Sequence, residues 1–277
     1  MVLSLALLAT ATCGVAQNSL ARRVFNPRLP SVDSAQQTSV RRFANFLSER
    51  DIEAIHTCAA TVNELNTEVS RSHGLKFASW STIYFNHRLC ELLPDLYHRL
   101  CSAAREADAD WQVLGAVDRL GMRCAEYHTV HTSGGLPKKT HYDAGSLITM
   151  DLMLSHTDDF EGGAFSTLEQ DNTLLNHQFE RGDLLVFLSH KFHSVSPVTQ
   201  GTRQVLVCEL WEGIERRCPT RCNIPFGPCS CRLKPDSLYV RFDDSKRTDL
   251  ATVPFSSKTP LFVKQSWTAM RRFSAQS

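Results

Sequence analysis

The chain has 277 residues, of which 42% are hydrophobic and 21% are charged, and this suits one domain of moderate size with extensions or two small domains. Its 30 basic and 29 acidic residues leave a net charge of +1, so no basic surplus predicts a nucleic-acid partner. No stretch reaches the roughly 18 apolar residues of a membrane span, so we expect no transmembrane helix.

The N-terminus carries an apolar run followed by small residues near Ala16. This pattern is typical of a secretory signal, although no Lys or Arg precedes Arg22. The Arg-bearing, acid-poor stretch that follows fits a transit peptide instead, and an ordinary buried N-terminus is the third alternative. We expect residues 1–16 to be a signal or targeting peptide, which places the protein in the secretory pathway or outside the cell, or else in an organelle or the cytoplasm. Residues 17–38 are polar and aperiodic and are predicted to be a linker.

Residues 39–110 are predicted to form a helical support region. Apolar residues at helical spacing predict one helix from about Val40 to Glu68, with Ser48 capping its second stretch. A second helical region is predicted from about Tyr84 to Ala109, where Pro94 either kinks the helix or begins a new segment.

Short strands separated by Gly-rich turns replace this pattern after Trp111. The clearest predicted strands are Met122–Thr129, Leu147–Leu154, Leu184–Phe187 and Val205–Glu212. Helices first and many short strands later favour an α+β chain whose sheet closes as a barrel or jelly roll, with residues 111–215 as the core domain.

The C-terminal part, residues 216–277, is predicted to be a Cys-rich segment followed by an extension. Its four clustered cysteines, Cys218, Cys222, Cys229 and Cys231, suit two disulfides in a secretory protein, although a zinc site and free thiols are alternatives. Loss of Cys13 with a signal would leave nine of the ten cysteines, so not all could pair within one chain. The scattered ones are expected to be buried free thiols: Cys58, Cys90, Cys101, Cys124 and Cys208.

Two candidate metal ligands, His141 and Asp143, lie two residues apart in the sequence THYDAGS. In an extended strand such residues project from the same face, so an imidazole nitrogen and a carboxylate oxygen converge on one point. His193 is the candidate third ligand. Two imidazoles and one carboxylate leave half of an octahedron open, as in the facial triad of non-haem Fe(II) oxygenases. We therefore expect these residues to bind Fe(II), with the open positions available to a 2-oxo acid and O2.

Arg203 follows His193 by ten residues, after the turn-forming segment PVTQG. We expect this turn to place Arg203 on a neighbouring strand with its side chain directed into the same cavity. A guanidinium binds a carboxylate through two parallel hydrogen bonds, and the far carboxylate of 2-oxoglutarate is such a group. His190 is the alternative third ligand, but only His193 places an arginine ten residues further on with the turn between them.

These residues resemble the 2-oxoglutarate/Fe(II)-dependent dioxygenase superfamily, and in style its prolyl 4-hydroxylase-like branch. The resemblance covers about Met122 to Trp211 and includes a Gly-Gly turn at Glu161–Phe165 and a strand at Arg181–Phe187 that leads to the distal histidine. It implies a double-stranded β-helix (jelly-roll) core with N-terminal flanking helices. The prolyl hydroxylases usually carry Lys where this chain has Arg203, so proline does not follow directly as the substrate.

The resemblance also suggests that Tyr127, on the strand before the His-x-Asp strand, joins Arg203 in binding the co-substrate. The alternative is an aromatic residue of the core. Thr149 and Thr202 are further hydroxyl candidates. Two acidic residues interrupt apolar strand patterns and face either the cavity or solvent: Asp151 and Glu209.

The predicted function is an Fe(II)- and 2-oxoglutarate-dependent dioxygenase that uses O2 and releases succinate and CO2. Its substrate would be a peptidyl prolyl or lysyl residue or a small molecule, and L-ascorbate would keep the iron reduced, as is common in this branch. Two alternatives are a jelly-roll binding protein without turnover and a cupin-like metal isomerase. The first would be supported by an incomplete triad, and the second would leave Arg203 unexplained. The sequence does not predict the oligomeric state.

Overall fold

A computed structural model describes residues 29–67, 79–114, 120–213, 215, 216, 218 and 221. The predicted leader at 1–16, most of the linker at 17–38 and most of the segment 216–277 lie outside these residues. The predictions for the leader and for the four clustered cysteines, three of which also lie outside, therefore stay predictions. No helix of the described part is long and apolar enough to cross a membrane.

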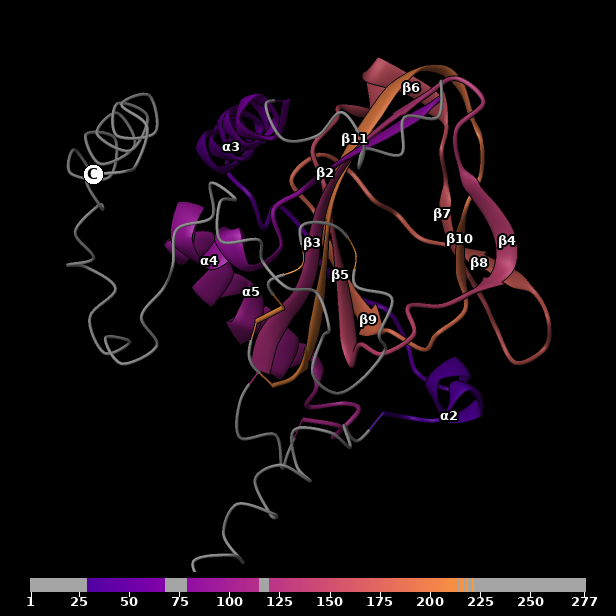
Figure 1. The fold of residues 1–277 in the computed structure, drawn as a ribbon. Helices are drawn as coiled ribbons and strands as arrows, with labels where there is room; N and C mark the ends of the chain where they lie inside the picture. Colours follow the sequence, from indigo (N-terminus) through magenta and orange to yellow (C-terminus); the bar gives the residue numbers. More distant parts are fainter. Residues whose placement is uncertain are drawn as a thin grey trace, which may run out of the picture.

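The larger of two antiparallel sheets forms the centre of the molecule (Figure 1). Its strands run in the order β1 (Arg41–Phe43), β9 (Leu184–Leu188), β5 (Ile148–Met153), β11 (Val198–Glu212), β3 (Leu120–His131) and β2 (Trp80–Tyr84), and β6 (Phe160–Gly162) pairs with β11. The smaller sheet has the order β4 (Leu136–His141), β10 (His193–Val195), β7 (Phe165–Leu168) and β8 (Leu174–Asn176).

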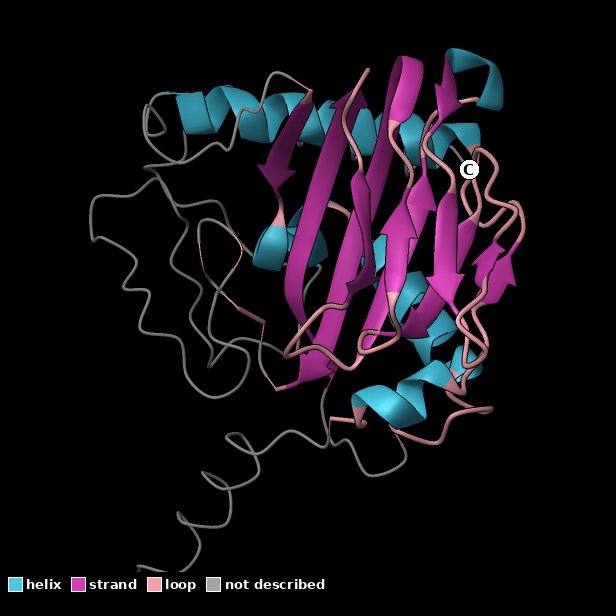
Figure 2. Cartoon of the chain, turned by 90° about the vertical axis from the view of Figure 1, so that its right-hand side faces the viewer, coloured by secondary structure: helices cyan, strands magenta, loops and turns pink. Residues whose placement is uncertain are grey.

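The longer helices cover one face of the larger sheet, and the smaller sheet lies on its other side (Figures 1 and 2). The helical elements are α2 (Val32–Gln36), α3 (Glu49–Thr67), η1 (Asn86–Arg88), α4 (Leu89–Leu92), α5 (Pro94–Ala107) and η2 (Thr157–Asp159). Apolar residues of α3 and α5, such as Ile55 and Leu100, share one buried cluster with Met150 and Leu206 of the sheet. Burying this amphipathic face is what holds the helices, because their intrinsic propensity alone would be marginal.

The strands of the larger sheet present chemically different faces, because successive side chains point to opposite sides. In β11, Leu206 and Leu210 belong to the cluster under the helices, whereas Arg203 and Glu209 lie on the opposite face. A second apolar cluster joins the two sheets on that opposite side: Phe165, Leu185, Phe187 and Val195. The predicted α+β architecture with N-terminal helices is thus confirmed at this level, and its strands pair antiparallel.

The two predicted helical stretches differ from the structure at their starts. The first helix begins at Glu49, and Arg41–Phe43 instead forms β1, which pairs with β9 along the edge of the larger sheet. Ser48 does cap the helix: its Oγ accepts a bond from the Asp51 N–H, and the Asp51 carboxylate accepts one from the Ser48 N–H. Pro94 begins α5, where its missing N–H has no cost.

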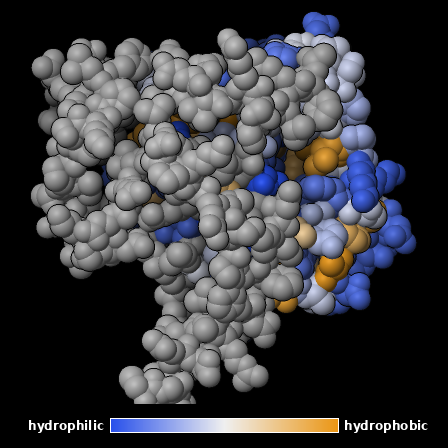
Figure 3. Space-filling model, viewed as in Figure 1, coloured by the Kyte–Doolittle hydropathy of each residue, from blue (hydrophilic) through white to orange (hydrophobic). Residues whose placement is uncertain are grey.

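The described surface in the view of Figure 3 mixes hydrophilic and hydrophobic side chains, and the hydrophobic groups there are small and separate. The large apolar residues exposed over the described chain are Tyr142, Leu174 and Leu175. Scattered apolar residues of this kind are normal for a folded protein, so they indicate no partner surface by themselves.

Candidate metal centre and co-substrate pocket

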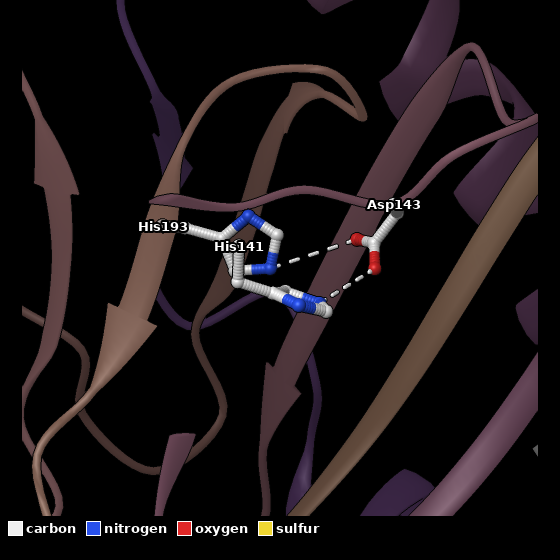
Figure 4. A group of neighbouring side chains, drawn as sticks. All are labelled: His141, Asp143 and His193. Atoms are coloured by element: carbon white, nitrogen blue, oxygen red, sulfur yellow. Dashed lines mark hydrogen bonds and ion pairs between the residues drawn. The ribbon is translucent and has the colours of Figure 1, made fainter. Parts of the chain in front are cut away.

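Three residues from two strands and a loop converge inside the molecule: His141 at the end of β4, Asp143 just after it and His193 at the start of β10 (Figure 4). Nε2 of His141 lies 3.3 Å from Oδ1 of Asp143, and Nε2 of His193 lies 3.7 Å from Oδ2. Their candidate ligand atoms all lie within 4.8 Å of one another. Register explains the meeting, because His193 pairs directly with His141 in the smaller sheet.

The orientation of His193 is set by its backbone surroundings. Its Nδ1–H donates to the carbonyl of Lys191 over 3.0 Å, which leaves the lone pair of Nε2 facing Asp143. The loop that carries Lys191 is held by Gln36 of α2, whose amide oxygen accepts a bond from the N–H of Phe192. The short helix in the predicted linker therefore supports the candidate ligand from outside.

Asp143 is anchored by two polar groups of the larger sheet. Oγ1 of Thr149 donates to Oδ2 of Asp143 over 2.8 Å. The backbone N–H of Asp143 donates to the carbonyl of Ser189 over 2.7 Å. Burial alone would raise the pKa of this carboxyl, but its interactions with the imidazoles of His193 and His141 help to hold that pKa below its ordinary value. Asp143 is thus an ionised carboxylate, as a metal ligand requires.

His190, the alternative ligand, does not join this group. Its Nδ1 interacts with the carbonyl of Pro30 at 2.8 Å, and its ring lies against Tyr142. Among the described residues, the group of histidine, cysteine and acidic side chains that could hold a metal ion is the one that contains His193.

Arg203 lies on β11 with its side chain buried between the sheets, 2% exposed. Nε and Nη2 have no hydrogen-bond partner among the described residues, and the guanidinium lies 5.7 Å from the centre of the Phe179 ring. Burial lowers the pKa of Arg203 to about 10, so the group keeps its charge at neutral pH. A buried guanidinium with free donors is a site for an anion, because leaving such donors unpaired is costly.

The Gly-Gly turn provides the room for this arginine. Gly162 and Gly163 both have positive φ, +75° and +61°, which favours glycine. A Cβ atom at position 163 would also lie 2.9 Å from Cδ of Arg203. The turn predicted from the sequence therefore touches the candidate co-substrate residue directly.

Asp151 and Glu209 both face the interior rather than solvent. Asp151 is 6% exposed on β5, and its Oδ1 has no partner among the described residues. Burial raises the pKa of Asp151 to about 7, in spite of the opposing charge of Arg203. Asp151 is therefore about half protonated at neutral pH, next to the charge that would receive an anion.

Tyr127 does not come together with Arg203. It pairs with Leu206 in the sheet register and therefore points to the helix-covered face. Its hydroxyl bonds to Nδ1 of His56 at 2.8 Å and accepts from the Gln204 amide at 2.7 Å. This placement favours the alternative, an aromatic residue of the core, over the predicted binding of the co-substrate.

Three polar residues of the interior were not singled out from the sequence: Glu126 and His128 on β3, and Arg221 beyond the last strand. Arg221 Nη2 lies 3.1 Å from Oδ1 of Asp143 and Nη1 lies 3.2 Å from Oε1 of Glu126. The signal for the first two was available, since Glu126 and His128 alternate with the apolar Ala125 and Tyr127. Nothing local in the sequence marks Arg221.

The residues present fit a metal ion and a dicarboxylate. Two imidazole nitrogens and one carboxylate oxygen match the ligand set of non-haem iron sites, and they leave other coordination positions open. The partnerless guanidinium of Arg203 matches the distal carboxylate of a dicarboxylate.

No family model matches the chain. A PKHD-type hydroxylase of Idiomarina loihiensis is 33% identical over 82 residues, which are 30% of this chain and 35% of that relative. The match thus spans about a third of the relative's length.

Several solved structures are similar in arrangement. A viral collagen prolyl hydroxylase from Paramecium Bursaria Chlorella virus-1 aligns with a TM-score of 0.45 and 12% identity over 65% of this chain and 98% of that chain. A prolyl-4-hydroxylase from Pseudomonas putida aligns with a TM-score of 0.43 and 19% identity over 66% of this chain and 97% of that chain. A PKHD-type hydroxylase and two prolyl hydroxylases are thus among the proteins to which parts of this chain are similar.

Proposed function

We propose that this protein is an Fe(II)- and 2-oxoglutarate-dependent dioxygenase that hydroxylates a C–H bond of a peptidyl or small-molecule substrate. The observation that carries the proposal is the presence of a complete His-Asp-His group together with the buried guanidinium of Arg203, whose Nε and Nη2 have no partner among the described residues. The proposal includes the finer fold: we infer that the two facing sheets form a double-stranded β-helix.

Each residue has a defined part in this reaction. His141, Asp143 and His193 would hold Fe(II), and Thr149 fixes the carboxylate of Asp143 by its hydrogen bond. Arg203 would bind the distal carboxylate of 2-oxoglutarate. The bound pair of iron and 2-oxoglutarate supplies activation of O2, with release of succinate and CO2 and transfer of one oxygen atom to the substrate. L-ascorbate would restore the ferrous state between turnovers.

The apolar cluster between the sheets keeps bulk water from one side of this site. The rings of Phe165 and Phe187 lie 5.9 Å and 5.0 Å from the ring of His193, centre to centre. Both rings are almost fully buried. A water-poor surrounding strengthens the charge interactions of the ligands and protects reactive species from side reactions.

The test is O2-dependent formation of succinate from 2-oxoglutarate by the Fe(II)-loaded chain. We expect His141→Ala and His193→Ala to lose metal binding and succinate formation. His190→Ala is the matched control, because it removes a neighbouring histidine that lies outside the group. Equal succinate formation by the parent and His193→Ala would refute the proposal. A chain that binds metal and 2-oxoglutarate but forms no succinate with any substrate tested would favour a binding protein or an isomerase.

A further inference from the structure

Two carboxylates beyond the candidate metal ligands lie buried on the same interior face of the larger sheet. Glu126 stands on β3 and Glu209 on β11, 5% and 0% exposed. A guanidinium bridges them and Asp143: Nη1 of Arg221 contacts both glutamates, at 3.2 Å for Glu126, and Nη2 lies 3.1 Å from Asp143. The proposed reaction assigns no part to these two glutamates.

The position of Glu126 is fixed by a chain of hydrogen bonds on the strand side. The indole N–H of Trp80 donates to Nδ1 of His128 over 3.0 Å, so Nδ1 acts as an acceptor. Nε2 of His128 then carries the proton and donates to Glu126 over 3.2 Å. Burial acts to raise the pKa of Glu126, but this hydrogen bond and the charge of Arg221 outweigh it and hold that pKa below its ordinary value. Glu126 is therefore a fixed, ionised acceptor.

Glu209 is held from the other side. Arg123 donates to its Oε2 over 2.7 Å, and the hydroxyl of Ser146 contacts the same oxygen. Arg123 neutralises one of the two glutamate charges, and the two charges of the proposed Fe(II) ion would be offset by Asp143 and by the 2-oxo-acid carboxylate of 2-oxoglutarate. One buried negative charge is left, and burying it unpaired would be costly, so the site requires one further cation.

In the free chain, Arg221 supplies that cation, but it is less firmly placed than the groups it contacts. Its side chain is 32% exposed, against 7% for Glu126 and 0% for Glu209. It also comes from beyond the last strand of the sheet, whereas the two glutamates stand within strands. The two glutamates are therefore part of the sheet, whereas Arg221 is not.

We propose that the substrate of this site carries a guanidinium group, such as an arginine side chain, which binds Glu126 and Glu209 in place of Arg221. This rests on the proposed dioxygenase function. A substrate guanidinium in the place of Arg221 would also contact Asp143, and the methylene groups of the substrate side chain would then lie next to the metal. A guanidinium suits the site better than an ammonium, because its planar fork can meet acceptors on different strands at once. Arg221 acts as an internal competitor.

The test is a calorimetric titration of the full chain loaded with Mn(II) and 2-oxoglutarate without O2, so that binding is measured apart from turnover. The probes are N-acetyl-arginine amide and its neutral analogue, N-acetyl-citrulline amide. We expect the arginine probe to bind at least about tenfold more tightly, because only it supplies the missing charge. Equal binding of the two probes, or no binding of the arginine probe, overturns the proposal.

Two variants separate a substrate site from a purely structural ion cluster. Arg221→Gln should bind the arginine probe about tenfold more tightly than the parent. Without the internal competitor, a larger fraction of the protein has its two glutamates free to bind the probe. Glu126→Gln should weaken binding of the arginine probe and leave binding of the citrulline probe unchanged. Arg41→Gln, which removes a surface arginine paired with Asp110, is the control and should change neither. Unchanged or weaker binding in Arg221→Gln would overturn the role of Arg221 as a competitor.

The outcome is distinguishable from failure of the dioxygenase proposal. Binding of Mn(II) and of 2-oxoglutarate is measured in the same samples before the probes are added, and melting temperatures verify that each variant is folded. The probe titration is repeated on the metal-free chain, because the carboxylates of Asp143, Glu126 and Glu209 are present there as well. A chain that binds metal and 2-oxoglutarate but not the arginine probe refutes the guanidinium substrate alone. A chain that binds neither the metal nor 2-oxoglutarate refutes the dioxygenase proposal.

Discussion

Gly163 lies directly against Arg203: a Cβ atom on residue 163 would stand 2.9 Å from Cδ of the arginine. Gly163→Ala should therefore displace the guanidinium and weaken binding of 2-oxoglutarate, while its φ of +61° adds backbone strain of about 1 kcal/mol. The measurement is the dissociation constant of 2-oxoglutarate in metal-loaded protein. Gly182→Ala is the matched control, because it has φ of +84° but meets the backbone of Leu47. Both should lower stability, and equal losses of 2-oxoglutarate binding would contradict the role of the turn.

Thr149 donates its hydrogen bond to Oδ2 of Asp143, so Thr149→Val should loosen the carboxylate without changing the size of the side chain. Loss of such a supporting bond typically costs about 10–100-fold in metal affinity. An anaerobic Fe(II) titration measures it. Thr202→Val is the control, since Thr202 contacts His131 at 3.1 Å instead and should keep the parent affinity. If Thr149→Val binds iron as tightly as the parent, the hydrogen bond does not support the metal centre.

Two of the three candidate metal ligands could be predicted because their spacing is local, whereas His193 was predicted from the residues that follow it. His141 and Asp143 are two residues apart, and His193 was chosen because Arg203 follows it by ten residues, although residues 198–201 of the expected turn lie in β11 instead. Tyr127 could not be placed in this way. Its face depends on the register between β3 and β11, and a shift of one residue would reverse it.

Other features depend on contacts between distant segments. The stretch at Arg41–Phe43 continues a helical pattern in the sequence but pairs with β9 as an edge strand, and Arg42 bonds to Asp183 at 2.7 Å. Tertiary pairing here overrides local propensity. Arg221 meets Asp143 from 78 residues away, and no local pattern encodes that contact.

Asp151 should make co-substrate binding depend on pH. Its pKa of about 7 means that it is protonated below neutrality and ionised above it, where its charge competes with a carboxylate for Arg203. We expect the affinity for 2-oxoglutarate to fall by about tenfold one pH unit above that pKa, because the protonated fraction falls by this factor. Asp151→Asn should lose this component. A pH profile that is the same in the parent and the variant would show that Asp151 is not responsible.

The same group should affect stability with a defined sign. The pKa of Asp151 is about 7 in the folded chain and about 4 in the unfolded chain, so the folded chain binds more protons between these values. The free energy of unfolding should therefore fall as pH rises from about 4 to 7 and then level off. Denaturant unfolding at several pH values, with Asp151→Asn as reference, measures this contribution. If the free energy of unfolding of Asp151→Asn falls with pH between about 4 and 7 as steeply as that of the parent, Asp151 does not make this contribution.

Tyr127→Phe tests the placement of this residue in the core. The variant loses the bonds to His56 and Gln204 but keeps the ring, so we expect a loss of about 1–2 kcal/mol in stability. The dissociation constant of 2-oxoglutarate should stay at the parent value, because the hydroxyl points away from Arg203. Weaker binding of 2-oxoglutarate with unchanged stability would instead support the role that the resemblance suggested.

The buried pair of Arg123 and Glu209 should be costly to break from one side. Their side chains are 3% and 0% exposed, and the nitrogen and oxygen lie 2.7 Å apart. Arg123→Met leaves Glu209 with Arg221 as its cationic partner, and removing one member of a buried pair typically costs about 3–5 kcal/mol. In Arg123→Met/Glu209→Leu the uncompensated charge is gone as well, so the double variant should recover much of this loss. Chemical denaturation of the parent, both single variants and the double variant gives the coupling energy directly. If the two single losses simply add, the pair is not coupled, and the charge balance inferred around Glu209 does not hold.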